Sequence, residues 1–582
     1  MRQFLKFVLA TLVGLILFCF LGFLFLAGLV SSVSKEKKTT IEANSVLRLD
    51  LNYPIHEMND DNPFAALGLG NSKLKKGTGL TDIRQCIKKA KTDDNIKGIY
   101  LDLGLYSNGL ATTDAIRDAL LDFKKSGKFV YAYGEVISQK GYYLATAADQ
   151  IFINPAGGME LKGFGGQTMY FKGMFDKLGI EVQDFHCGAF KSAIEPFIRT
   201  NSSEPNRQQL TLIYTDVYNQ FVNKISAARK IDTAQLHTII DGLQAENPEK
   251  DIELKLIDGA LYYDQVLDKI KERVGIDKKK DVSFVDLGKY ATTIDKDLTE
   301  SNKIAVVYAD GEIVDGDGKD GQVGGEAFSK IIRKLRKDDK VKAIVLRVNS
   351  PGGSALASDV MWRELVLAEK DKPLIVSYGD LAASGGYYIS CMGDKIFAQP
   401  NTITGSIGVF GLIPNAQKFF NDKLGITFDE VKVTKHGVLG GGTKPLDAEE
   451  SAFAQKNVER TYRQFKSRVA EGRHKDTAYI ESIAQGRVWT GNQGLANGLV
   501  DTIGGLDDAI AYAAAKANLK SFRIKEYPEE KTLSEKIEES FGDVKAGVLK
   551  DELGDQYEMY KKMEWVKSAT GVQARLAYDL GF

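Results

Sequence analysis

The sequence is poor in the residues that bind metals or form disulfide frameworks, with five histidines and four cysteines among 582 residues. No two histidines have a metal-binding spacing such as HExxH, and the cysteines fit no CxxC pattern. We therefore expect no metal, no cofactor and no disulfide framework. Each cysteine is interpreted as a small buried side chain.

An excess of charge of either sign is also lacking, since 78 acidic residues balance 77 basic ones. Proteins that bind nucleic acids usually carry a basic surface, so we expect no nucleic-acid partner. Hydrophobic residues make up 43% of the chain, a typical value for a globular protein. At about 100–200 residues per domain, the length allows several domains or two large ones.

Charged residues are absent from a stretch of 28 residues, Phe7 to Ser34. About 20 apolar residues span a bilayer, whereas the apolar part of a cleaved signal peptide has about 7–15. We predict one uncleaved transmembrane helix over residues 7–34, with residues 1–6 on one side and the body on the other. Lysines flank the stretch on both sides, so charge alone does not fix its orientation.

The sequence does contain an internal duplication. Gly141-Tyr-Tyr-Leu-Ala-Thr matches Gly386-Tyr-Tyr-Ile-Ser-Cys at an offset of 245 residues. Ile96-Lys-Gly-Ile-Tyr-Leu matches Val341-Lys-Ala-Ile-Val-Leu at the same offset. Repeats of this kind predict two copies of one structural unit.

Each copy alternates apolar strands with helical stretches, which predicts an α/β fold built as tandem duplicated βαβ domains. The predicted strands are Val46–Leu51, Gly98–Leu103 and Phe129–Tyr133 in the first copy, and Ile304–Tyr308, Ala343–Val348 and Leu374–Tyr378 in the second. We predict a first unit over residues 45–272, a charged linker over 273–302, a second unit over 303–527 and a helical tail over 528–582.

Ser384 is the candidate nucleophile. It follows the predicted strand Leu374–Tyr378 and lies between small residues at the start of a helix, where backbone N–H groups lie near its hydroxyl. The aligned residue of the first copy is Gln139, which cannot act as a nucleophile. Taken alone, the pattern favours an ordinary helix N-cap serine.

Lys191 is the candidate base, because no histidine has a context suited to activating a serine. A lysine can accept a proton when burial lowers its pKa from about 10.4. Lys191 lies among small and apolar residues, and its counterpart in the second copy is about Gly437. Lys435 lies two residues away from that counterpart and ranks below Lys191. A surface lysine with its ammonium group in water is the alternative interpretation.

Gly352 and Gly353 follow the predicted strand Ala343–Val348. Paired glycines let the backbone approach a ligand and direct N–H groups toward it. An ordinary turn is the alternative interpretation.

These segments resemble bacterial signal peptide peptidase A, also called protease IV, in its long duplicated form (peptidase family S49). The resemblance covers nearly the whole chain and includes the motifs Gly188-Ala-Phe-Lys191-Ser-Ala-Ile-Glu-Pro-Phe, Ala383-Ser384-Gly-Gly-Tyr and Gln485-Gly-Arg-Val-Trp-Thr-Gly. It implies a Clp-protease/crotonase-like fold for both units. It also implies a Ser/Lys dyad, with Ser384 as nucleophile and Lys191 as general base and acid.

The resemblance implies further roles near the dyad. Ser406, in Thr-Gly-Ser-Ile-Gly-Val-Phe, would orient the lysine amine, although a turn hydroxyl is the plainer interpretation. The N–H groups of Gly353 and Gly385, with Gly352 as a near alternative, would form the oxyanion hole.

The function implied by the resemblance is that of a serine endopeptidase that degrades released signal peptides and other unfolded apolar peptides. It would be a homotetramer anchored by a single span in the bacterial inner membrane, with residues 1–6 in the cytoplasm and the body in the periplasm. Two alternatives stay open: an acyl-CoA enzyme of the crotonase type, and an inactive membrane scaffold.

Overall fold

The computed structural model describes residues 40–59, 78–294, 299–319, 321–529 and 571–576, and scattered positions between 3 and 18. The predicted transmembrane helix, residues 7–34, lies mostly outside the described residues. Within the described part of the chain, no helix is both long enough and apolar enough to cross a membrane.

The first half of the chain forms a parallel sheet, as its buried apolar runs predict. Neighbouring strands of this sheet, in spatial order, are β6 (Gly259–Ala260), β4 (Gln150–Met159), β3 (Phe129–Ile137), β2 (Ile96–Asp102), β1 (Ser45–Asp50) and β7 (Phe284–Asp286).

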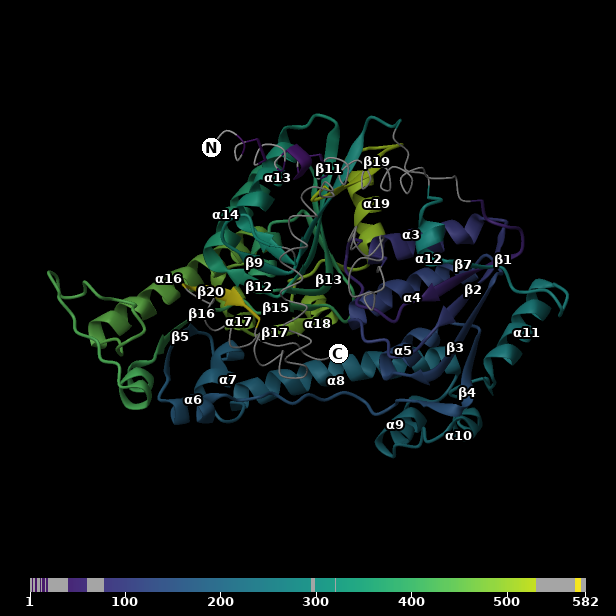
Figure 1. Ribbon diagram of the computed structural model, residues 1–582, viewed down its shortest axis with the longest axis horizontal. Helices are drawn as coiled ribbons and strands as arrows, with labels where there is room; N and C mark the ends of the chain where they lie inside the picture. Colours follow the sequence, from purple (N-terminus) through teal and green to yellow (C-terminus); the bar gives the residue numbers. More distant parts are fainter. Residues whose placement is uncertain are drawn as a thin grey trace.

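The second half repeats this arrangement and confirms the predicted duplicated α/β architecture (Figure 1). Its sheet runs β17 (Val488–Thr490), β15 (Ile403–Gly405), β13 (Leu374–Ala383), β11 (Val341–Ser350), β8 (Lys303–Asp310) and β19 (Arg523–Tyr527). In addition, β14 (Lys395–Ala398) pairs with β13, and β18 (Thr502–Ile503) pairs with β14. Each predicted strand lies within or overlaps an observed one.

Helices cover these sheets. Those of the first half are α3 (Leu80–Thr92), α4 (Leu110–Lys124), α5 (Gln139–Ala145), α6 (Lys172–Leu178), α7 (Glu195–Ile198), α8 (Glu204–Arg229), α9 (Thr233–Asp241), α10 (Pro248–Glu253), α11 (Tyr263–Val274) and α12 (Leu287–Ala291). Those of the second half are α13 (Gly325–Lys337), α14 (Ala355–Asp371), α15 (Gly385–Ser390), α16 (Ala448–Arg473), α17 (Thr477–Ile483), α18 (Gly491–Ala496) and α19 (Leu506–Lys516).

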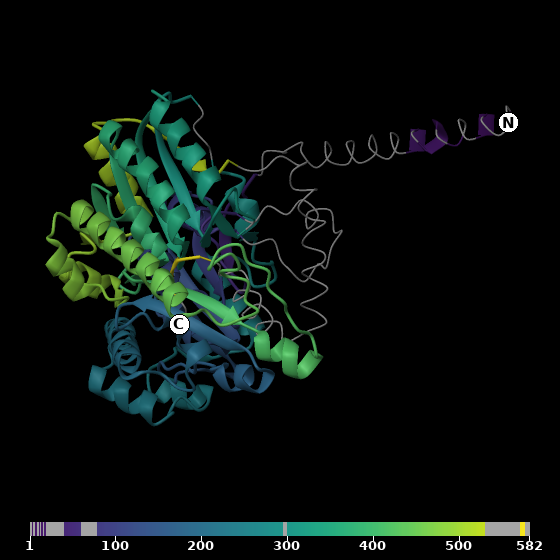
Figure 2. The ribbon, with the colours of Figure 1, turned by 90° about the vertical axis from the view of Figure 1, so that its left-hand side faces the viewer.

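A third sheet joins the two halves. Its order is β10 (Gln322–Gly324), β9 (Glu312–Val314), β12 (Gly352–Ser354), β20 (Gln573–Arg575), β16 (Val409–Asn415) and β5 (Glu181–Cys187). Strand β5 belongs to the first half by sequence but pairs antiparallel with β16 of the second, from Val409 opposite Cys187 to Asn415 opposite Glu181. Figure 2 shows the blue segment of the first half directly below the green strands and helix of the second.

Buried polar contacts connect the carboxyl ends of β11 and β13 to the first half. Arg347 Nη2 lies 2.8 Å from Glu57 Oε1, and both side chains are almost fully buried. The backbone N–H of Thr112, in the first turn of α4, donates to Asp380 at 3.0 Å. The two halves therefore form one continuous body.

Two segments differ from the prediction. The expected linker, residues 273–302, contains β7 and α12, and β7 extends the first sheet by pairing with β1. The described part of the expected helical tail, residues 571–576, contains a strand, β20. Both strands have only three residues, too few for a periodic apolar pattern to reveal them.

Candidate active site

Ser384 lies where β13 ends and α15 begins. Its backbone has φ 55° and ψ −112°, a conformation that is strained for a residue with a side chain. The Ser384 N–H donates to the carbonyl of Gly405 on the adjacent strand β15 at 2.8 Å, which holds this turn in place. A sharp strand-to-helix turn of this kind directs a serine hydroxyl away from its own backbone.

Lys191 reaches the same place from the first half. It comes four residues after β5, whose pairing with β16 carries the chain across to the second half. The N–H of Phe190 donates to the carbonyl of Gln485 at 2.9 Å, and Gly486 packs directly against the Lys191 backbone. The Gln485-Gly-Arg motif thus packs directly against the lysine motif.

The structure brings the predicted serine and lysine together. Lys191 Nζ lies 2.9 Å from Ser384 Oγ, although 193 residues separate them in the chain. Nζ also lies 3.0 Å from Ser406 Oγ and 3.2 Å from the Ser406 carbonyl oxygen. All three side chains are buried, with exposed fractions of 3% or less. The Lys191 amine can therefore donate hydrogen bonds to Ser406 while the lone pair of the amine nitrogen faces Ser384.

Burial lowers the pKa of Lys191 well below its ordinary value. Removing an ammonium group from water disfavours the charged form, so the amine is held neutral over more of the pH range. A neutral amine has the lone pair that a general base needs.

The predicted glycines lie beside the serine. A Cβ atom at Gly352, which has φ 93°, would lie 2.5 Å from the Gly385 nitrogen and 2.2 Å from the carbonyl oxygen of Ala574. Only glycine fits such a close approach at this backbone conformation. Gly353 belongs to β12 and pairs with Ala574 of β20. Gly353 and Gly385 thus both lie close to Ala574.

Gln139, the counterpart of Ser384, and Lys435, the lower-ranked lysine, have other contacts. The Gln139 side chain accepts from the N–H groups of Lys162 and Gly163 at 2.8 Å and donates to the Gly163 carbonyl at 3.0 Å. Lys435 is exposed and pairs with Glu449. Both residues have structural contacts in place of catalytic ones.

Sequence reasoning missed two features of the site. The carbonyl of Gly408 lies 3.5 Å from Ser384 Oγ, and a backbone acceptor leaves no mark on residue type. The strand β20 pairs with β12, and Arg575 and Leu576 line the same small space as Lys191 and Ser406. Its sequence, Gln-Ala-Arg, carries no signal that distinguishes it from the rest of the tail.

In the described part of the chain, one cluster has the geometry to hold a cation: His436, Asp447 and Glu450, before and at the start of α16. Lys444 Nζ lies 3.7 Å from Glu450 Oε1, and His436 Nδ1 lies 3.4 Å from the same oxygen. Protein groups thus already surround this carboxylate.

Comparison with known proteins gives a consistent result. The model of peptidase family S49 matches residues 122–277 and 367–520, one segment in each half and slightly more than half of the chain. The chain is 37% identical to Protease 4 of Salmonella typhi over 489 residues, which cover 82% of this chain and 78% of that protein. It is 33% identical to the chloroplastic serine protease SPPA of Arabidopsis thaliana over 516 residues, 87% of this chain and 75% of that protein.

Among solved structures, a ClpP1 mutant from Listeria monocytogenes aligns with a TM-score of 0.24 and 16% identity, covering 35% of this chain and 94% of that one. A likeness of this size leaves the Clp-protease/crotonase-like fold a prediction.

Proposed function

The chain belongs to peptidase family S49 and is a serine-type peptidase, and on that premise we propose that it cleaves peptide bonds with Ser384 as nucleophile and Lys191 as general base and acid. The observation that carries the proposal is the distance of 2.9 Å between Lys191 Nζ and Ser384 Oγ in a buried setting that lowers the lysine pKa. The predicted residues thus meet the geometric and electrostatic requirements of a Ser/Lys dyad.

In the proposed mechanism, Ser384 Oγ attacks the substrate carbonyl carbon while neutral Lys191 takes its proton. Ser406 holds the amine in position. The N–H groups of Gly353 and Gly385 donate to the oxyanion. Protonated Lys191 then gives its proton to the leaving amine, and water releases the acyl group.

The proposed substrates are released signal peptides and other unfolded apolar peptides. The support is the resemblance of the lysine and serine motifs to signal peptide peptidase A, together with the uncharged stretch over residues 7–34. An anchor in the bacterial inner membrane, with the body in the periplasm, would hold the site near apolar peptides that stay in the bilayer.

The proposed partner is further copies of this chain, as a homotetramer. The internal repeat supplies the argument. Ala111 and Ala115 of α4 are buried, with exposed fractions of 1% and 7%, in the helix that faces the second half. Their counterparts in α14 at the offset of 245, Leu356 and Val360, are 68% and 44% exposed. The face of α14 in the second half is thus apolar and exposed, whereas the equivalent face of α4 in the first half is buried against the second half.

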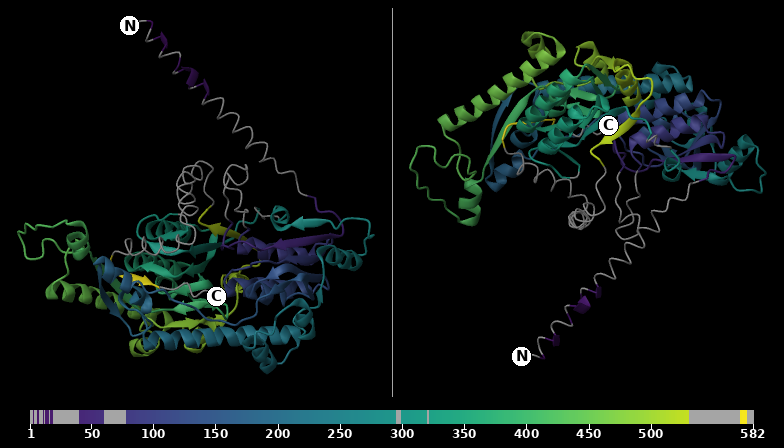
Figure 3. Two further views of the ribbon diagram at one scale, coloured as in Figure 1. Left: turned by 60° about the horizontal axis from the view of Figure 1, so that its bottom comes forward. Right: turned by 90° about the horizontal axis from the view of Figure 1, so that it is seen from above.

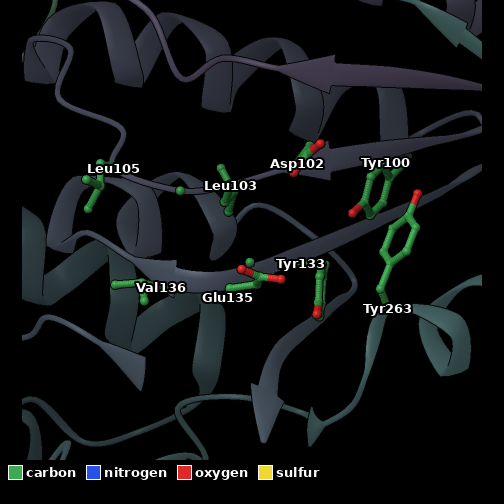
Figure 4. Close-up of a pocket in the computed structure, with 10 residues that line it drawn as sticks. Tyr100, Asp102, Leu103, Leu105, Tyr133, Glu135, Val136 and Tyr263 are labelled. Carbon is green, nitrogen blue, oxygen red and sulfur yellow. The ribbon is translucent and has the colours of Figure 1, made fainter. Parts of the chain in front are cut away.

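Within the described residues, the corresponding surface of the first half is exposed. A pocket of about 450 Å³ lies at the carboxyl ends of β2 and β3, with Leu105, Val136 and Glu135 on its rim (Figure 4). Glu135 is the counterpart of Asp380, which in the second half binds α4. Leu105 is 76% exposed and Val136 is 50% exposed.

A second exposed segment lies between β16 and α16. This segment extends from the body in Figures 1 and 3. Residues 427–433 are the counterpart of β5 at an offset of 246, yet they form no strand in the described structure, and Val431 and Val433 are 91% and 100% exposed. Repeating the β5–β16 register would pair these residues with residues 164–170 of another copy. Head-to-tail contacts of this kind can close into a ring.

Acylation by a fluorescent serine-reactive inhibitor tests the dyad. We expect labelling of the wild type and none of Ser384→Ala or Lys191→Ala, with parallel loss of peptide hydrolysis. Equal labelling of the wild type and Ser384→Ala would exclude Ser384 as nucleophile. Turnover of a CoA thioester in place of a peptide would favour the crotonase-type alternative, and absence of both activities the scaffold.

A further inference from the structure

The loop that carries Lys191, residues 188–192, is held by one buried side chain from the helix that follows it. Gln209 lies in the second turn of α8 and is 1% exposed. Its side-chain nitrogen, Nε2, lies 3.1 Å from the Phe190 carbonyl oxygen and 2.9 Å from Ser192 Oγ. A single side chain therefore contacts the residues on both sides of the proposed base.

The same carboxamide reaches the second half of the chain. Gln209 Oε1 accepts a hydrogen bond from the Val488 N–H at 3.3 Å. Val488 belongs to β17 and pairs with Gly405, the residue before Ser406. The carbonyl of Arg487, which precedes Val488, accepts from the Ser406 N–H at 2.7 Å. Gln209 thus connects the lysine loop to the segment that holds Ser406, whose hydroxyl contacts the lysine amine.

The neighbours of the Gln209 carboxamide fix its orientation. A backbone N–H group only donates and a backbone carbonyl only accepts, so the carboxamide oxygen faces Val488 and the nitrogen faces Phe190. A side chain at this position must therefore donate on one side and accept on the other. Leucine can do neither, although it has nearly the same length.

Further hydrogen bonds hold Gln209 itself. Its Nε2 lies 3.2 Å from Asn206 Oδ1, and Asn206 Nδ2 donates to Glu195 Oε2 at 3.0 Å. The same oxygen accepts from the N–H of Ser203, the N-cap residue of α8, at 3.0 Å. Glu195 belongs to the same sequence motif as Lys191. A connected buried network of this kind is rigid, so it keeps Gln209 facing the lysine loop.

Burial is the cause that lowers the pKa of Lys191. The charged groups around the lysine loop have contacts of their own: the Arg487 guanidinium lies 5.1 Å from the centre of the Phe190 ring, and Arg575 pairs with Glu312. A displaced loop would admit water to the amine, which would raise the pKa of Lys191 toward its ordinary value.

We propose that Gln209 is a positioning residue for the dyad: by holding both neighbours of Lys191 against β17, it keeps the amine within hydrogen-bonding distance of Ser384 and Ser406. Gln209 does not touch the reacting atoms and acts through the lysine loop. The amine lies 2.9 Å from Ser384 Oγ and 3.0 Å from Ser406 Oγ. A displacement of about 1 Å would break this geometry and can lower a rate by about a hundredfold. The inference rests on the proposed dyad.

The pH dependence of peptide hydrolysis by Gln209→Leu tests the proposal. We expect kcat to fall by about ten- to a hundredfold while KM changes by less than about threefold, because the amine moves and the peptide-binding surface does not. The pH at which kcat/KM reaches half of its maximum should rise by about one unit, since water reaches the amine. The matched control is Gln208→Leu, at the exposed neighbour on the same helix, which should behave like the wild type.

A merely structural role of Gln209 predicts a different result. A variant that only folds less completely has a lower kcat at every pH, and its pH midpoint equals that of the wild type. That result, or an unchanged kcat, would overturn the proposal. Gln209→Asn keeps the test open if Gln209→Leu does not fold. Its carboxamide is one methylene shorter and cannot reach both halves, so it should lower kcat by about tenfold and raise the pH midpoint.

Lys191→Ala, measured in parallel, separates this proposal from the proposed function. Peptidase activity retained by Lys191→Ala would overturn the dyad, and the role of Gln209 with it. Inactive Lys191→Ala together with a wild-type kcat and pH midpoint in Gln209→Leu, or in Gln209→Asn, would overturn the positioning role and leave the dyad intact.

Discussion

The two halves of the chain follow the same path from strand to helix, yet they begin that helix differently. In the first half, Ser138 has a relaxed conformation, φ −65° and ψ 158°, and caps α5 by accepting from the Gly141 N–H at 3.2 Å. In the second half, Ser384 has φ 55° and ψ −112°, and its hydroxyl faces Lys191. Strain of this kind costs about 1–3 kcal/mol. It occurs in the half that carries the proposed nucleophile, while the first half keeps the relaxed form.

The largest expected effect is the loss of peptidase activity when either residue of the proposed dyad is replaced. Ser384→Ala or Lys191→Ala should lower kcat/KM for a peptide by about 10³-fold or more, since each removes a group used in bond cleavage. Lys435→Ala replaces the lysine that lies two residues from the counterpart of Lys191 in the second half, and it should leave kcat/KM unchanged.

The converse change places a serine at position 139 in the first half and removes Ser384 from the second. Gln139→Ser in the Ser384→Ala background should stay inactive, because the first half's serine would face no buried lysine. Recovery of activity would mean that the halves are interchangeable, contrary to the asymmetry described above.

The next effect compares two ion pairs at equivalent edges of the two sheets. Glu57→Ala leaves Arg347 buried without its carboxylate and should lower the free energy of unfolding by about 3–5 kcal/mol. Asp102→Ala, which removes the partner of the partly exposed Arg48, should lower it by about 1 kcal/mol or less. Urea unfolding measures both, and equal losses would contradict the difference in burial.

A smaller effect depends on pH. Because burial lowers the folded-state pKa of Lys191, the unfolded chain binds more protons between that pKa and the ordinary value of about 10.4. Stability should therefore rise with pH through this window, by up to about 1.4 kcal/mol per pH unit relative to Lys191→Met.

The same lowered pKa governs activity, which should increase with pH as the lysine loses its proton. Identical pH dependence of unfolding in the wild type and Lys191→Met would indicate that Lys191 titrates alike in both states.

The smallest effect on the fold concerns the segment 427–433. Val433→Asp should change the free energy of unfolding by about 0.5 kcal/mol or less, since the side chain is fully exposed. It should nonetheless abolish assembly in light scattering. Leu243→Asp, at an exposed position of the first half, serves as control, and an unchanged oligomer in Val433→Asp would contradict the proposed strand pairing.

Much of the architecture could be predicted because β2, β3, β11 and β13 are long, buried and apolar. The proximity of Ser384 and Lys191 could be predicted because their motifs resemble those of signal peptide peptidase A. The repeat, which places Gln139 and about Gly437 opposite them, agreed with that resemblance. Strands β7 and β20 could not, because each is three residues long and pairs through backbone atoms that any residue supplies. The function of β5 was equally hidden, since its partner β16 lies more than 200 residues later.

The crossing of β5 into the second half also sets when the enzyme can first act. The proposed base, Lys191, is synthesised early, and the proposed nucleophile, Ser384, follows 193 residues later. Ser406, Gly408 and residues 485–486, which contact the lysine or its neighbour Phe190, come later still. A ribosome must therefore complete most of the second half before a dyad exists. On the proposed dyad, a fragment that contains the first half alone lacks the nucleophile and should have no peptidase activity.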